Sequence, residues 1–269
     1  MQKLRNRMDY SLRQFFRWRR RGFRPAFHPQ HPLFQNLDGI RRDKALQTEA
    51  RFHNDYHLGD LKANTNSGNY QENLFYLGML ETAFGQLETN KPLPETIHAA
   101  DIGPSHWFYV QALMAFLKWY QADTPRNITL TGFEADAWRV YTDLYSRYDR
   151  ATGYAGDLQG VAYIPEAFHT QPGSYDLIFL FFPFVFPSDH LDWGLPMQEF
   201  QPRQLLEAAW QSLRPGGRLM VVNQGAEEHQ QESQNFAACG IPMKTSLRMD
   251  DLLFRYDLDR YIILSEAHA

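Results

Sequence analysis

The sequence has little cysteine and no long hydrophobic run, and both features bear on the cellular compartment of the protein. Cys239 is the single cysteine among 269 residues, which excludes an internal disulfide and favours a reducing compartment. The longest hydrophobic run spans residues 177–186 and contains Pro183, whereas a membrane-spanning helix needs about 20 apolar residues. The first residues are charged and lack the apolar stretch of a secretory signal. We therefore expect a cytoplasmic protein.

Acidic residues are scarce at the start of the chain and abundant after it. Residues 1–25 contain nine Lys or Arg and one acid, Asp9, which gives them a net charge of +8. Because the whole chain carries −4, residues 26–269 carry −12. Such an acidic body argues against a broad nucleic-acid-binding face.

The basic segment is predicted to form an amphipathic helix that ends near Gly22 and Pro25. Apolar residues recur in it at helical spacing, with arginines between them: Leu4, Met8, Leu12, Phe15 and Phe16. Three roles for this helix are open. The first is to lie on an anionic membrane surface, which would make the protein membrane-peripheral, and the second is to bind RNA through its arginines. The third is to pack on the acidic body of its own or a neighbouring subunit. The opposite charges of segment and body favour packing.

The region before the first strand is predicted to be mostly helical. Residues 25–36 read as an extended connector, residues 38–52 as a short helix and residues 53–69 as a loop. Asn69 and Glu72 fit a capping box that opens a helix through Leu87. Prolines at 92 and 94 then separate this region from the rest. We therefore divide the chain into 1–94, a basic helix with a connector and a helical lid, and 95–269, a second domain.

From residue 95 onward, strand and helix patterns alternate. Short apolar runs predict strands, and apolar residues at helical spacing predict helices between them. The strands are expected at 97–101, 128–133, 161–164, 177–182 and 218–223, the helices at 110–117, 137–148, 202–213 and 227–239, and a closing antiparallel pair at 243–247 and 261–264. This alternation predicts an α/β fold with a mostly parallel sheet. The unbroken apolar run at 177–182 fits a central strand covered on both faces.

Acids and a glycine follow the first three predicted strands. Asp101 and Gly103 follow the first, Glu134 the second, and Glu166 with Ala167 the third. The carboxyl ends of parallel strands form the ligand-binding edge of an open α/β sheet. A glycine lets the backbone approach a ligand, and a carboxylate offers two acceptor oxygens to a diol. The pattern therefore favours a nucleoside-like ligand.

This ordered set resembles the class I S-adenosylmethionine-dependent methyltransferases, over about residues 95–225. The resemblance implies a Rossmann-like sheet of seven strands with helices on both faces, and S-adenosylmethionine as cofactor. It also implies a set of cofactor-binding residues: Asp101, Gly103, Ser105, Glu134, Glu166, Ala167 and Phe181. Ser105 and Trp107 stand where the family has its second and third glycines, and Trp107 is expected to push the next helix outward or to wall the pocket.

Aromatic residues dominate the segment after the fourth strand, 181–193. Phe181 stands where relatives that methylate nucleic-acid amines have Asn or Asp, which argues against that reaction. We therefore expect methyl transfer to a small hydrophobic or aromatic acceptor. His190 is the first candidate for a base, oriented by Asp189 or Asp192, and His106 is the second.

Two other functions stay open at this point. One is a noncatalytic, methyltransferase-like binding or scaffold protein, and the other is an RNA methyltransferase guided by the basic segment. No metal site is predicted, because His53 and His57 lie in the expected loop without a third strong ligand.

Overall fold

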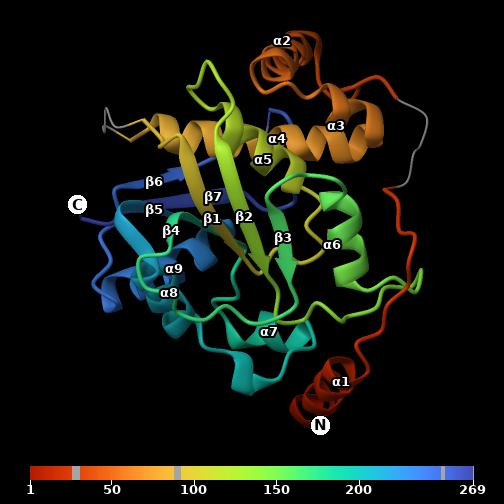
Figure 1. Ribbon diagram of the computed structural model, residues 1–269, viewed down its shortest axis with the longest axis vertical. Helices are drawn as coiled ribbons and strands as arrows, with labels where there is room; N and C mark the ends of the chain where they lie inside the picture. Colours follow the sequence, from red (N-terminus) through yellow and green to blue (C-terminus); the bar gives the residue numbers. More distant parts are fainter. Residues whose placement is uncertain (26–30, 88–91, 250–251, 269) are drawn as a thin grey trace.

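The protein contains a seven-stranded sheet in the order β3-β2-β1-β4-β5-β7-β6, seen in a computed structural model that describes residues 1–25, 31–87, 92–249 and 252–268 (Figure 1). Five strands are parallel, and β7 is antiparallel to both of its neighbours. The strands are β1 (Thr96–Ile102), β2 (Asn127–Phe133), β3 (Val161–Ile164), β4 (Tyr175–Phe181), β5 (Leu213–Gln224), β6 (Thr245–Arg248) and β7 (Arg260–Glu266). The predicted Rossmann-like fold, with its closing antiparallel pair, is confirmed.

The strand order creates a switch point between β1 and β4. The chain builds the sheet outward from β1 through β2 to β3, then returns to place β4 on the other side of β1. Asp101 of β1 is level with Gly132 of β2 and Phe179 of β4. In open α/β sheets, ligands bind at the carboxyl ends of the strands beside such a reversal. The residues that follow β1, β2 and β4 therefore define the candidate site.

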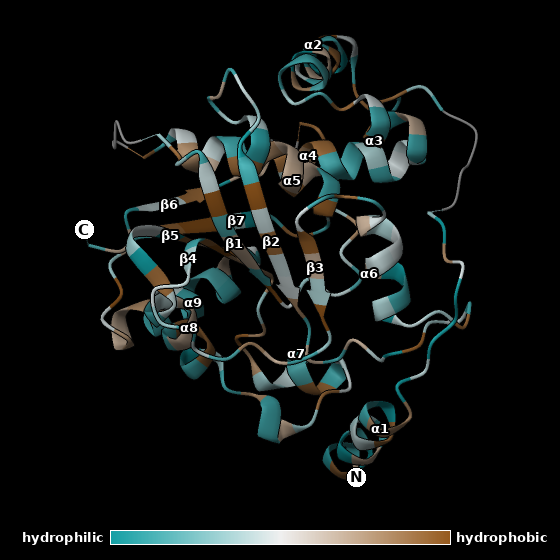
Figure 2. Ribbon diagram, viewed as in Figure 1, coloured by the Kyte–Doolittle hydropathy of each residue, from teal (hydrophilic) through white to brown (hydrophobic). Residues whose placement is uncertain are grey.

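Helices cover both faces of the sheet. They are α1 (Gln2–Phe16), α2 (Gly39–Asp55), α3 (Gly59–Asn64), α4 (Ser67–Gly85), α5 (Val110–Trp119), α6 (Arg147–Ala155), α7 (Pro187–Asp192), the 3-10 helix η1 (Met197–Glu199), α8 (Pro202–Gln211) and α9 (Gly225–Ala238). In β4, Phe179 packs with α4 and α5, whereas Ile178 packs with α8 and α9. Both faces of β4 are buried, which explains its unbroken apolar sequence. Hydrophobic colour accordingly concentrates in the central strands (Figure 2).

One predicted helix start differs from the structure because another residue caps the helix. Helix α4 begins at Ser67, since the side chain of Asn66 accepts the Asn69 N–H at 2.9 Å. The predicted box of Asn69 with Glu72 does not form. The loop expected at 53–69 contains the six-residue helix α3, which is too short to show a clear period.

The helix predicted at 137–148 is wrong. Residues 137–146 form turns closed by a bridge between Val140 and Ser146. Leu144 has a φ of 64°, which a helix does not allow. The real helix, α6, starts only after Ser146, where a reciprocal capping box with Asp149 fixes its first turn.

The helices before β1 pack onto the sheet. Phe52 of α2 and Leu77 of α4 belong to the same hydrophobic core as the β4 residue Phe179, and α4 packs against α5 and β7. The division of the chain at 94/95 and the lid stay predictions. Part of the predicted connector, residues 26–30, lies outside the described residues. In the part of the chain that the structure describes, no helix is long and apolar enough to cross a membrane.

Candidate functional site at the carboxyl ends of β1, β2 and β4

The turn after β1 is open at one point and tightly packed at another. Gly103 has a φ of 74°, and a Cβ there would meet no other atom within 4 Å. Ser105 and Trp107 also have positive φ, at 55° each, and α5 begins only at Val110. The backbone at Gly103 is therefore accessible to a ligand, while the helix start that would normally follow the turn is displaced.

The indole of Trp107 explains the displacement. Its side chain is fully buried, and a Cβ on Gly132 would lie only 2.9 Å from its Cη2 atom. The indole Nε1–H donates to Oδ2 of Asp101 at 2.7 Å. The Tyr163 hydroxyl donates to the Ser105 carbonyl at 2.6 Å and holds the turn from the same face of the sheet. Trp107 thus fills the space between β2 and the start of α5.

Asp101 is a buried carboxyl that accepts from Trp107 and lies near the Tyr109 hydroxyl. Its Oδ1 atom and the hydroxyl of Tyr109 are both buried without a hydrogen bond among the described residues. Burial raises the pKa of Asp101 from 3.8 to about 7, although the nearby polar groups of Tyr109 and Trp107 oppose the shift. The carboxyl of Asp101 therefore titrates near neutrality.

We expect the free energy of unfolding of the wild type to fall, relative to that of Asp101→Asn, as pH rises from about 4 to about 7. The folded pKa lies above 3.8, so folding binds a proton in this window and rising pH favours the unfolded chain. The full effect has an upper bound of about 4 kcal/mol, since each pKa unit is worth about 1.4 kcal/mol. Urea unfolding across this range measures it. Asp123→Asn, at an exposed position, is the matched control; parallel pH profiles for wild type and Asp101→Asn would contradict the expectation.

The carboxylate of Glu134 ties the end of β2 to the turn after β1. Its Oε2 accepts the Ser105 N–H and its Oε1 accepts the Asp136 N–H, each at 2.8 Å. Arg147, which is buried, lies 3.5 Å from Glu134 and 3.6 Å from Asp136. Glu134 is itself buried. Each carboxylate oxygen has two lone pairs, so Oε2 keeps one acceptor position beyond its backbone bond, whereas Nη1 of Arg147 lies beside Oε1.

The other predicted cofactor residues are less close to this centre. Glu166 is exposed, and Ala167 is half-buried; they follow Ile164, whose carbonyl accepts the Glu134 N–H at 3.0 Å. Phe181 is buried at the end of β4, with its ring centroid 5.1 Å from that of Tyr109. The structure thus brings Asp101, Ser105 and Glu134 around one turn, and places Phe181 beside that turn through Tyr109.

The two candidate bases are held in structural contacts. Nε2 of His190 lies 2.9 Å from the Pro196 carbonyl; since a carbonyl only accepts, Nε2 carries the proton. Burial lowers the pKa of His190. No hydrogen bond joins it to Asp189 among the described residues, and Asp189 instead accepts from Ser188 at 3.4 Å. Burial lowers the pKa of His106 to about 4, helped by nearby arginines. Catalytic roles for His190 and Asp189 stay predictions.

An aromatic group beside the end of β4 was not singled out from the sequence. Tyr76 stacks on Tyr109 with centroids 4.3 Å apart and planes 10° apart, and its ring lies 5.4 Å from Phe181. These three aromatic residues come from α4, the start of α5 and β4. The aromatic content of 15% does not predict which rings pack together. The group forms a wall next to the turn that holds Asp101.

A buried arginine borders this wall. The guanidinium of Arg260 lies 3.9 Å from the Tyr256 ring centroid and 4.8 Å from that of Phe182. The Tyr256 hydroxyl donates to Glu72 at 2.7 Å. Nη1 of Arg260 donates to the Leu258 carbonyl at 2.8 Å, and its Nε has no hydrogen-bond partner in the described part of the chain. Burial lowers the pKa of Arg260, and nearby Tyr256, Glu228 and Glu72 oppose that shift. The unpartnered Nε–H is a buried donor of the kind that an anionic ligand or a water satisfies.

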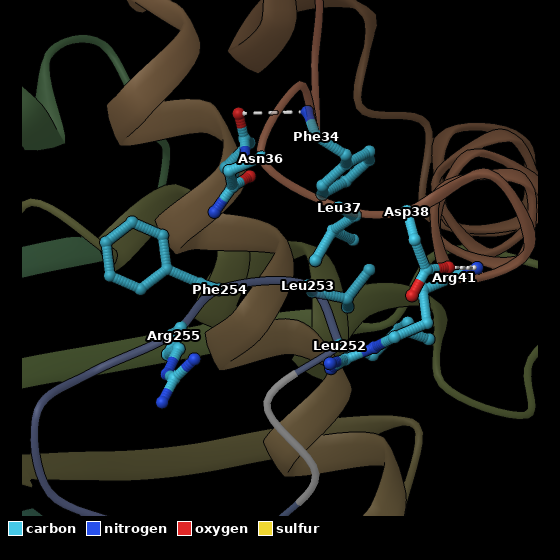
Figure 3. A pocket seen from close by; sticks show the side chains of 10 residues that line it. Phe34, Asn36, Leu37, Asp38, Arg41, Leu252, Leu253, Phe254 and Arg255 are labelled. Atoms are coloured by element: carbon cyan, nitrogen blue, oxygen red, sulfur yellow. Dashed lines mark hydrogen bonds between the residues drawn. The ribbon is translucent and has the colours of Figure 1, made fainter.

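Two cavities border the loop between β6 and β7. One of about 480 Å³ lies between that loop and the segment before α2; Figure 3 shows Phe34 and Leu37 facing Leu253 across it, with Arg41 to one side and Arg255 to the other. A smaller one of about 150 Å³ is lined in part by Phe75, Tyr256 and Arg260. None of the predicted cofactor-binding residues lines either cavity. No three His, Cys, Asp or Glu side chains gather as a metal site in the described ranges.

Solved structures with this fold are mostly methyltransferases. A SAM-dependent methyltransferase from Aquifex aeolicus is 14% identical, with a TM-score of 0.50 over 73% of this chain and 92% of its own. A putative class I S-adenosylmethionine-dependent methyltransferase from Listeria monocytogenes is 13% identical, with a TM-score of 0.49 over 86% and 68%. A putative methyltransferase bound to the Trm112 activator, from Haloferax volcanii, is 12% identical, with a TM-score of 0.47 over 84% and 97%.

Sequence comparison adds no relative: neither a protein-family model nor a curated protein matches the chain. At such low identities, structural likeness establishes the fold. The chain therefore has the Rossmann-like fold of the class I S-adenosylmethionine-dependent methyltransferases, and its activity has to be argued from its own residues.

Proposed function

We propose that the protein transfers a methyl group from S-adenosylmethionine to a small aromatic or hydrophobic acceptor. The observation that carries the proposal is the position of Glu134 beside the open backbone of Gly103, at the switch point of the sheet. A nucleoside needs an acceptor for its ribose diol and a close backbone approach, and these two residues supply both. S-adenosylmethionine, when bound, supplies an electrophilic methyl on sulfur.

The residues present fit this cofactor in two respects. The spare acceptor position on Oε2 of Glu134 suits a hydroxyl donor, because the Ser105 N–H occupies only one of its lone pairs. The Oδ1 of Asp101 and the Tyr109 hydroxyl lack a well-formed hydrogen bond among the described residues, although the two side chains interact, and they are buried polar atoms of the kind that a ligand or ordered water satisfies. The chain would then align the acceptor with the methyl and exclude water, which supplies much of the acceleration in such a displacement.

The acceptor class follows from the aromatic wall. Tyr76, Tyr109 and Phe181 are buried against one another next to the end of β1, which carries Asp101, and such a ring-rich border favours an apolar or planar molecule. Arg260, whose Nε has no hydrogen-bond partner among the described residues and whose guanidinium contacts the Tyr256 ring, suits an acceptor with a carboxylate or similar group. A planar or apolar acid therefore matches this side of the site best.

A noncatalytic binding or scaffold protein is the second candidate, and one observation favours it. The two acids at the centre already have protein partners: Trp107 for Asp101, and Ser105 with Arg147 for Glu134. A site whose acceptors are used internally holds its own turn in place without any ligand.

Calorimetric titration with S-adenosylmethionine separates these two functions. We expect saturable binding by the wild type and at least about tenfold weaker binding by Glu134→Ala, because losing a charged hydrogen-bond acceptor costs about 1.5–3 kcal/mol. Glu227→Ala, at an exposed position on α9, is the matched control and should bind like wild type. Far-UV circular dichroism checks that each variant is folded. No heat of binding at millimolar ligand would reject the methyltransferase and favour the scaffold.

A further inference from the structure

Helix α1 is attached to the rest of the protein by its polar face. The Asn6 side chain, which is buried, donates to the carbonyls of Leu191 at 2.7 Å and Leu195 at 3.1 Å. Arg13 pairs with Asp136 at 2.9 Å, and Gln14 donates to the Ala135 carbonyl at 2.6 Å. The helix therefore binds along α7 and the segment after β2, at the edge where the candidate site lies (Figure 1).

The apolar face of α1 consequently points away from the protein. A period of about 3.6 residues puts the apolar positions of this helix roughly opposite Asn6 and Arg13. Exposure of these side chains ranges from 50% to 79%: Leu4, Met8, Leu12, Phe15 and Phe16. Soluble proteins rarely leave so many large apolar side chains together in water, and such a patch usually marks an interaction surface. Figure 2 shows α1 at the periphery of the molecule.

The exposed apolar surface continues beyond the helix. Trp18, half-exposed, donates its Nε1–H to the carbonyl of Leu144, which is itself exposed. The surface is thus shared by α1, Trp18 and the turn at 140–144, which the Trp18–Leu144 hydrogen bond holds together.

Basic side chains accompany this surface. The exposed ones in residues 1–25 are Lys3, Arg5, Arg7, Arg17, Arg19, Arg20, Arg21 and Arg24. Arg19 and Arg20 also bind the body of the protein, through Asp149 and the Asp143 carbonyl, which leaves the other six for a ligand. We propose that this face of the protein, centred on α1, binds an anionic lipid surface with its apolar side chains in the interface and its arginines at the headgroups. A helix that combines these two features is of the kind that lies in a membrane interface. The inference does not depend on methyl transfer.

Lipid is favoured over the other occupants by the kind of side chain exposed. An RNA strand would pair with the arginines but would leave Leu4, Met8 and Leu12 against phosphates. A second copy of the chain would have to offer an apolar face of matching shape as well as acids. A lipid surface accepts apolar side chains and cations together and needs no matching shape.

Flotation with lipid vesicles tests the proposal on the full chain. We expect binding to vesicles of equal parts phosphatidylglycerol and phosphatidylcholine, weaker binding to pure phosphatidylcholine, and a decrease with added salt. Leu12→Asp/Phe15→Asp should reduce binding to the anionic vesicles at least about tenfold. The matched control is Ile40→Asp/Met243→Asp, which adds the same charge at exposed apolar positions elsewhere and should bind like wild type. Unchanged unfolding midpoints would show that both variants are folded.

Several results would overturn the proposal. It fails if the wild type does not float with anionic vesicles, or if both double variants lose binding equally. It also fails if sedimentation shows a wild-type dimer that Leu12→Asp/Phe15→Asp dissociates while vesicles bind neither protein. If the protein does not bind vesicles but binds RNA, and Leu12→Asp/Phe15→Asp still binds RNA, the basic segment is a nucleic-acid-binding segment instead.

Discussion

Replacing Trp107 with alanine is expected to lower the free energy of unfolding by at least about 3 kcal/mol, because removing a buried tryptophan costs about 3–5 kcal/mol. The indole is fully buried and packs against the place where Gly132 has no side chain. Its loss opens a cavity under the turn after β1 and also leaves Asp101 without its donor. A buried polar group without a partner adds about 1–3 kcal/mol. Urea unfolding at a pH where the variant is still folded measures the sum.

Two further variants divide this effect into packing and hydrogen bonding. Trp107→Phe keeps a ring in the cavity but has no N–H, so its deficit should be smaller than that of alanine. Trp18→Ala removes a tryptophan that is half-exposed, and it should cost less than about 1 kcal/mol. If Trp107→Ala behaved like Trp18→Ala, the indole would not support the turn, and the displacement of α5 would need another cause.

The central strands of this fold were readable from the sequence because they contain apolar runs bounded by turn residues. The fourth strand shows this well, since residues 177–182 form an unbroken apolar run and β4 is buried on both faces. The helix predicted at 137–148 failed because aromatic residues there have helical spacing without helical backbone. The Tyr141 carbonyl instead accepts the Leu144 N–H in a tight turn, and the φ of Leu144 is positive. The capping box of Ser146 with Asp149 determines where α6 starts.

The candidate site was predictable in its acids and unpredictable in their partners. The positions of Asp101 and Glu134 follow from where two strands end, which is a local property of the sequence. The hydrogen bond from Trp107 to Asp101 depends on the path of the turn between these two residues. The contact of Arg260 with Tyr256 depends on the path of a loop near the end of the chain. The docking of α1 by its polar face is equally hidden, because an amphipathic period normally indicates which face is buried, and here that expectation is reversed.

Arg147→Met is expected to destabilise the protein by about 3–5 kcal/mol at neutral pH, the usual cost of removing one partner from a buried ion pair. The guanidinium is 2% exposed and lies between Glu134 and Asp136. Methionine has a similar length and fills the space, so the loss reports charge and hydrogen bonding. The two carboxylates would then face each other with less compensation, although Asp136 keeps Arg13 and Arg139. Chemical unfolding with circular dichroism detection measures the difference.

A second substitution at this position identifies the cause. Arg147→Lys keeps the positive charge between the two carboxylates but loses the planar guanidinium, so its deficit should be smaller than that of Arg147→Met. Arg248→Met is the matched control, since Arg248 pairs with Asp259 at the surface, with side chains 63% and 46% exposed, and its loss should cost less than about 1 kcal/mol. Equal deficits for Arg147→Lys and Arg147→Met would mean that the charge is not the cause, and Glu134 would then owe its place beside Gly103 to its backbone donors alone.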